Sequence, residues 1–198
     1  MVNKKAVVYT VLPFGLASII ILILMVLSIK TDLNVLLLIT PISYVLSYFL
    51  IVKEKPSIRK PEIKSIVFSI LAVILISTIV GLFMPKVEEQ EILKTVKANN
   101  SFPLLTKFLV VVIGPFAEEL YFRVGYRKIL ENDKVYLIVP SLIFGLSHLS
   151  TQSSVVVNLV IALSTTLTAM VFTYFYNKEE NLFDVWIPHS IINFLAVI

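Results

Sequence analysis

The sequence contains no cysteine, which excludes disulfide bonds and thiolate metal sites. Charged residues are also scarce, at 15% of the 198 positions, whereas average proteins have about 25%. Arginine is rarer still, since only Arg59, Arg123 and Arg127 are present. The basic residues form no arginine-rich or aromatic-interleaved patch, so the net charge of +4 does not indicate nucleic-acid binding. We therefore expect no nucleic-acid partner.

Long apolar segments make up most of the sequence. Hydrophobic residues account for 58% of the chain and the mean hydropathy is +0.93. A membrane-spanning helix needs roughly 20 mainly apolar residues. These segments predict an all-α fold, a polytopic membrane bundle of about seven transmembrane helices. The predicted spans are Ala6–Ile29, Val35–Val52, Ser65–Met84, Leu104–Ile129, Val135–Leu149, Val155–Tyr176 and Val185–Ile198.

Short polar loops between the spans leave no room for a soluble partner domain, so we predict one membrane domain over residues 1–198. Within it, 1–103 would hold the N-terminal spans and loops, and 104–198 the helices that carry polar motifs. The charged segment Val87–Lys97 is either a short interfacial helix or a solvated loop. The last span reaches only about 21 Å at 1.5 Å per residue, which suits a partial or buried helix.

Lysine and arginine are distributed unevenly between the two sets of loops. With the N-terminus in the cytoplasm, eleven of them fall on the inner side and five on the outer side, as the positive-inside rule requires. We therefore predict a multi-pass protein of the plasma membrane, surrounded by lipid, with a cytoplasmic N-terminus. The excess of lysine over arginine favours a bacterial source.

Few ionisable residues lie inside the apolar spans, where each charge costs roughly 2.5–3.5 kcal/mol on insertion scales. They are Glu118, Glu119, Arg123, His148 and His189, and the two histidines are the only ones in the chain. Residues kept at such cost are either paired or functional. The set therefore predicts a site inside the membrane.

The spacing of the acidic residues separates two roles. Glu119 and Arg123 lie at i and i+4 on one helix face, so we expect them to form a structural ion pair. Glu118 lies about 100° round the helix and faces another neighbour. Since it has no such partner nearby, Glu118 is the better candidate for chemistry.

Two later spans repeat the four-residue spacing. Phe144 and His148 share a face of one helix, and His189 and Asn193 share a face of the last. Phe144 is most simply a packing residue. Asn193, one turn from His189, could orient it or donate a hydrogen bond to an oxyanion. Three helices can therefore direct polar groups toward one point.

Two carboxylates and one guanidinium leave about one excess negative charge if both histidines are neutral. A proton can relieve it, and a carboxyl group near a histidine can then act as general base and acid on water. Alternatively, Glu118, His148 and His189 could hold Zn²⁺ with a position open for water. The residues alone leave both choices open.

Three short motifs run through these helices in order: Glu118–Arg123 reads EExxxR, Phe144–His148 reads FxxxH and His189–Asn193 reads HxxxN. Together they resemble the CPBP family of CAAX proteases and bacteriocin-processing enzymes, also called Abi, which includes the type II CAAX prenyl endopeptidase. The resemblance covers roughly Leu104 to Asn193. It implies a helical intramembrane protease with a cavity reached from the cytoplasmic side.

The resemblance also implies roles for each residue. Glu118 and His148 would hold the attacking water, Glu119 and Arg123 would brace the site, and His189 with Asn193 would stabilise the oxyanion. The family's chemistry is described both with a metal, for which zinc is the candidate here, and as a metal-free glutamate mechanism. The expected substrate is a membrane-associated peptide or a lipidated protein.

Two other functions fit the same residues. The protein could act as a bacteriocin-immunity or regulatory protein that binds a partner without proteolysis. It could also be a small transporter or proton relay that uses Glu118 and the histidines.

Overall fold

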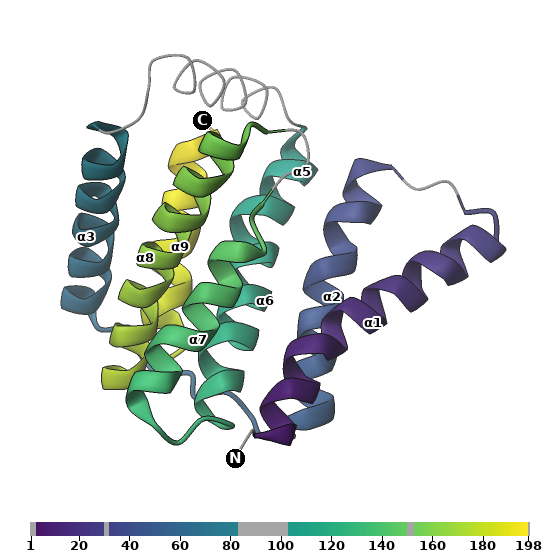
Figure 1. The fold of residues 1–198 in the computed structure, drawn as a ribbon, viewed down its shortest axis with the longest axis horizontal. Helices are drawn as coiled ribbons and strands as arrows, with labels where there is room; N and C mark the ends of the chain where they lie inside the picture. Colours follow the sequence, from purple (N-terminus) through teal and green to yellow (C-terminus); the bar gives the residue numbers. More distant parts are fainter. Residues whose placement is uncertain (1–2, 30–31, 83–102, 150–152, 198) are drawn as a thin grey trace.

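The structure is a computed structural model that describes residues 3–29, 32–82, 103–149 and 153–197 (Figure 1). These residues form helices and connecting turns, and no strand occurs among them. The helices are α1 (Lys4–Val26), α2 (Leu33–Ile51), α3 (Ile63–Leu82), α7 (Asp133–Leu146), α8 (Val155–Glu179) and α9 (Phe183–Val197). Between α3 and α7 lie four consecutive elements, α5 (Leu104–Phe108), η1 (Leu109–Ile113), α6 (Gly114–Glu119) and η2 (Leu120–Gly125).

The predicted all-α membrane bundle is confirmed. Each of the seven predicted spans coincides with a helix or, for Leu104–Ile129, with the continuous run from α5 to η2, which we call the motif helix. Four helices, α1, α2, α3 and α8, are long and apolar enough to cross a membrane. The segment Val87–Lys97 lies outside the described residues, so its predicted conformation is not tested.

The helices run alternately up and down, so the N-terminus and the C-terminus lie at opposite ends of the bundle (Figure 1). The motif helix packs between α2 and α9, α1 packs on α2, and α3 packs on α8 and α9. We call the end that holds the N-terminus the basic end, because the eleven basic residues predicted for one side lie there. They are Lys4, Lys5, Lys53, Lys55, Arg59, Lys60, Lys64, Arg127, Lys128, Lys134 and Lys178.

The outer helices expose large apolar side chains over their length. Examples are Met25 of α1, Leu82 of α3 and Val155 of α8, which are 70%, 78% and 75% exposed. Such an apolar exterior needs an apolar solvent, because water would not tolerate patches of this extent. The chain is therefore a membrane protein.

Two stretches of the motif helix, η1 and η2, are π-helical, with wider turns than an α-helix. Backbone groups inside a membrane must find partners within the protein. Here side chains of neighbouring helices supply donors to carbonyl oxygens in both stretches. The four bonds are Asn193 to Val110 (3.1 Å), Trp186 to Val112 (3.1 Å), Tyr9 to Tyr121 (3.0 Å) and Tyr136 to Arg123 (3.1 Å).

Pro115 gives a local reason for the first π-helical stretch. Proline has no backbone N–H, and its ring clashes with the carbonyl four residues earlier, that of Val111. In a π-helical pattern the missing N–H would have bonded to Val110, five residues earlier. The Val110 carbonyl therefore takes its hydrogen bond from Asn193 instead.

Aromatic side chains form a buried layer between the middle of the motif helix and the basic end. Tyr121 stacks on Tyr9 at a centroid distance of 4.4 Å and on Tyr44 at 4.7 Å. The Tyr9 and Tyr121 hydroxyls each donate to the other residue's backbone carbonyl. We call this set the aromatic layer, and its members are Tyr9, Tyr44, Tyr121, Phe122, Tyr126 and Phe172.

Candidate active site

The centre of the site is an ion pair with no exposure to solvent. Arg123 Nε lies 3.0 Å from Glu119 Oε2, and both side chains are fully buried. The structure thus contains the i, i+4 pair that the sequence predicts. A charge in this position cannot be solvated, so each partner is the other's main source of compensation.

Aromatic rings surround the rest of the Arg123 guanidinium. Its central carbon lies 4.7 Å from the Phe144 ring centroid, 5.8 Å from that of Phe172 and 6.0 Å from that of Phe122. Its two terminal nitrogens are buried and make no hydrogen bond. The cation is therefore stabilised by ring faces, an interaction that strengthens when water is excluded.

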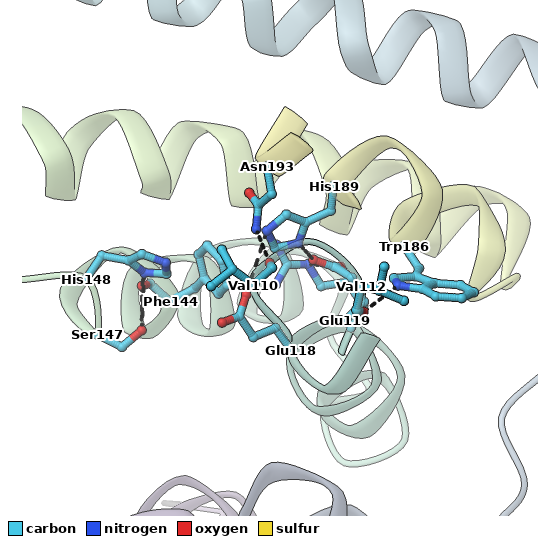
Figure 2. Close-up of polar contacts among 11 residues, drawn as sticks. Val110, Val112, Glu118, Glu119, Phe144, Ser147, His148, Trp186, His189 and Asn193 are labelled. Carbon is cyan, nitrogen blue, oxygen red and sulfur yellow. Dashed lines mark hydrogen bonds and ion pairs between the residues drawn. The ribbon is translucent and has the colours of Figure 1, made fainter. Parts of the chain in front are cut away.

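His189 connects the buried pair to Glu118. Its Nδ1 lies 2.7 Å from Glu119 Oε1, while its Nε2 lies 3.7 Å from Glu118 Oε2 (Figure 2). Because an ionised carboxylate only accepts hydrogen bonds, we assign the proton of a neutral His189 to Nδ1. Nε2 then presents a lone pair to Glu118. Their separation is too long for a direct hydrogen bond but suits one bridging water.

A cavity of about 470 Å³ opens beside this chain of contacts. Figure 2 shows polar side chains of the three motifs directed toward one space, and all of them line the cavity: Glu118, His148, His189 and Asn193. The Glu118 side chain is 24% exposed and that of His189 is 9% exposed. The apolar walls come from α2, η1 and the end of α9. This is a largely apolar pocket with a few convergent polar groups, the usual form of a ligand site.

His148 lies in the turn that follows α7 and is exposed, which places it at the mouth of the cavity. Its Nδ1 lies 2.8 Å from the Phe144 carbonyl oxygen, so this nitrogen carries the proton in the neutral ring, and Nε2 has no hydrogen-bond partner among the described residues. Among the described contacts, His148 makes no hydrogen bond or ion pair with Glu118. Phe144 packs between the His148 ring, at 4.5 Å, and Arg123.

Asn193 lines the cavity, and part of its hydrogen-bonding capacity is already used. One amide hydrogen is donated to the Val110 carbonyl at 3.1 Å. An asparagine amide has two hydrogens, so one remains for a ligand. Trp186, two turns earlier on α9, makes the matching bond to Val112. The two bonds flank His189 and fix the rotation of α9 against η1.

The side chains predicted as zinc ligands do not form a metal centre in this arrangement. Glu118, His148 and His189 line one cavity. However, no group of three His, Asp or Glu side chains that could hold a metal ion occurs in the part of the chain that the structure describes. Zinc binding therefore stays a prediction.

Sequence reasoning missed two features of the site. The first is the contact of His189 with Glu119, although a buried carboxylate that gives one oxygen to Arg123 still needs a donor for the other. The second is Trp186, whose part-buried N–H finds its acceptor in an apolar helix. Pro115 was the available signal, since a proline leaves helix carbonyls without their usual donors.

Two comparisons with known proteins found similarities. The family described as Type II CAAX prenyl endopeptidase Rce1-like matches residues 100–195. The UPF0177 protein YxdF of Lactococcus lactis subsp. lactis (strain IL1403) is 28% identical over 90 residues, which is 46% of this chain and 47% of that protein. The chain thus spans about half the length of this curated relative. No solved structure matches.

The matched region begins just before the motif helix and ends two residues after Asn193, so it contains all three motifs. It supplies only part of the cavity wall, because α2 and the last residues of α9 also line the cavity. Residues 100–195 of this chain are therefore similar to the Rce1-like family of type II CAAX prenyl endopeptidases.

Proposed function

We propose that this protein is an intramembrane endopeptidase that hydrolyses a peptide bond of a membrane-associated peptide or lipid-modified protein with water activated by Glu118. One observation carries the proposal: the Glu118 carboxylate faces the free Nε2 of His189 at 3.7 Å, inside a cavity, at a separation that one water can bridge. The similarity of residues 100–195 to an endopeptidase family supports it.

The chemistry requires a base and an acid, and Glu118 can serve as both. Its carboxylate accepts a proton from the bridging water while the water oxygen attacks the carbonyl carbon of the scissile bond. The resulting tetrahedral intermediate carries an oxyanion. Glu118 then gives the same proton to the leaving nitrogen, the C–N bond breaks, and an acid and an amine are released.

The other polar groups orient water and stabilise charge in this proposal. His148, at the cavity mouth, offers its free Nε2 to the water or to the substrate. Asn193 has one amide hydrogen for the oxyanion, and a protonated His189 would add an Nε2–H donor. Glu119 acts through His189, because it holds the imidazole in position from Nδ1. In this proposal, Glu118 and His189 hold the attacking water, and His148 assists from the mouth of the cavity.

The cell context belongs to the same proposal. Eleven basic residues at one end of the bundle support a cytoplasmic N-terminus in a bacterial plasma membrane. The connections that the structure describes in full run from three residues, between α8 and α9, to eleven, between α2 and α3. Connections of this size suit a short peptide or a lipid-anchored chain better than a docked globular domain.

The test is peptide cleavage by the purified protein, followed by mass spectrometry on candidate membrane-active and prenylated peptides. Glu118→Gln should lower the cleavage rate about 10²–10⁴-fold while the protein still folds. His148→Asn should lower it by a smaller factor. Glu131→Gln, an exposed carboxylate at the basic end, is the matched control and should leave the rate unchanged.

Cleavage that survives Glu118→Gln at the wild-type rate would overturn the proposal and favour a partner-binding or immunity role. A parallel reaction with a chelator addresses zinc. Loss of cleavage with chelator, and its return with added Zn²⁺, would establish the metal-dependent form of the mechanism.

A further inference from the structure

The cavity beside Glu118 extends from Glu118 toward the end of the bundle opposite the basic end. Its walls are built from the parts of the helices farthest from the basic end. They comprise the first turns of α2, with Leu36 and Thr40, the η1 stretch, with Leu109, and the last turn of α9, with Ala196. His148, exposed at the mouth, also lies at this end, where α7 finishes.

The aromatic layer separates the same cavity from the basic end. Tyr121 and Phe122, which follow Glu118 toward that end, are each 1% exposed, and Phe172 is fully buried. A second cavity, of about 410 Å³, does lie at the basic end and is lined by residues such as Lys55, Ser57 and Lys128. The two cavities share no lining residue. Water at Glu118 therefore comes from the other end.

Charge relates the two ends to the two sides of a membrane. The basic end carries eleven lysine and arginine residues and so lies on the cytoplasmic side by the positive-inside rule. The cavity then opens on the opposite side. This differs from the cytoplasmic access that resemblance to CAAX proteases implies.

We propose that the site takes its substrate from the extracytoplasmic side, so that the substrate class is a peptide whose scissile bond lies in the outer half of the membrane or has already crossed it. The identity of the ligand as a peptide substrate rests on the proposed function. The side from which the cavity is reached is independent of catalysis.

The absence of cysteine makes the test direct, because every introduced thiol is the only one in the chain. Thr40→Cys and Ala196→Cys place a thiol in the wall of the cavity, and Ser57→Cys places one in the cavity at the basic end. Intact cells are treated with a membrane-impermeant maleimide, which reacts only with thiols in contact with water. The same cells after permeabilisation, and the protein unfolded in detergent, provide the reference labelling.

We expect Thr40→Cys and Ala196→Cys to label in intact cells, and Ser57→Cys to label only after permeabilisation. The reverse pattern would overturn the inference. The inference would also be overturned if both cavity-wall thiols stayed unlabelled until the protein was unfolded, because the cavity would then be reached from lipid alone. Labelling in unfolded protein shows that each variant is made.

A second arm uses the wild-type protein in vesicles of known orientation, with a cleavable peptide supplied on one side. Cleavage should occur only when the peptide is added on the side opposite the basic end. If no peptide is cleaved from either side while the labelling pattern holds, the proposed function fails and the access inference stands.

Discussion

The N-terminal helices and the C-terminal helices of this protein are stabilised by different means. In α1, only Tyr9 and Pro13 are buried over 23 residues, and in α3 only three of 20. In η2, by contrast, all six residues are buried. α1 and α3 need to be little more than apolar, because lipid is their solvent, whereas α2 buries six residues against the rest of the bundle. The C-terminal helices must satisfy a buried ion pair, two histidines and irregular backbone, so their sequence is constrained residue by residue.

The largest expected effect in this comparison comes from the buried charge. Glu119→Gln removes the counter-charge of Arg123 and weakens the support of His189, and should destabilise the protein by about 3–5 kcal/mol. The check is the midpoint of thermal unfolding in a mild detergent.

Arg127 and Asp133 supply the matched control, since their ion pair has nearly the same length, 2.9 Å, but the two side chains are 24% and 66% exposed. Asp133→Asn should cost no more than about 1 kcal/mol. Equal losses for the two variants would show that burial does not separate the two pairs, and the contrast drawn above would be lost.

A smaller effect is expected from close packing between helices. A Cβ atom on Gly145 would lie 1.9 Å from Thr166 Oγ1 and 2.7 Å from the backbone oxygen of Ala162, so Gly145→Ala must push α7 and α8 apart. We expect a loss of about 1–3 kcal/mol in unfolding free energy, with reduced activity because His148 follows α7.

Gly15 in α1 is the control, because a Cβ atom there meets nothing within 4 Å. Gly15→Ala should leave stability unchanged or raise it slightly, since alanine is the better helix former. Comparable losses of unfolding free energy in Gly15→Ala and Gly145→Ala would contradict the difference between the two groups of helices.

The smallest effect is expected where α1 does contact the rest. Tyr9→Phe keeps the ring stacked on Tyr121 but removes the hydroxyl that donates to the Tyr121 carbonyl. Hydrogen bonds between membrane helices contribute about 0.6 kcal/mol on average and at most about 1.7 kcal/mol. Unfolding should therefore shift by a fraction of the Glu119→Gln effect. A shift as large as that of Glu119→Gln would mean that α1 is more than a lipid-facing helix.

How much the sequence could predict follows from the same contrast. Seven apolar segments were enough to locate each helix in the described part of the chain to within a few residues, because hydropathy is the main determinant of a membrane helix. The Glu119–Arg123 pair was predictable too, since four-residue spacing brings two side chains together on any helix. The division of the single domain at residue 103 stays a prediction.

Contacts between helices were not predictable in the same way. The bond of His189 to Glu119 depends on the rotation of α9. Trp186 and Asn193 fix that rotation through bonds to the Val112 and Val110 carbonyls of the π-helical stretch η1. The sequence expectation that Glu118 works with His148 used motif order alone. That pairing stays a prediction. The structure adds a contact that the sequence did not predict, in which His189 Nε2 lies 3.7 Å from Glu118 Oε2.

The stacked rings beneath the pocket have a consequence for the cell. A polar pocket inside a membrane would shorten the insulating path on which a transmembrane proton gradient depends. Tyr121, Phe122 and Phe172, which are at most 1% exposed, fill the space between the pocket and the basic end. We expect them to act as a barrier to protons, which a proton relay through Glu118 would have to break.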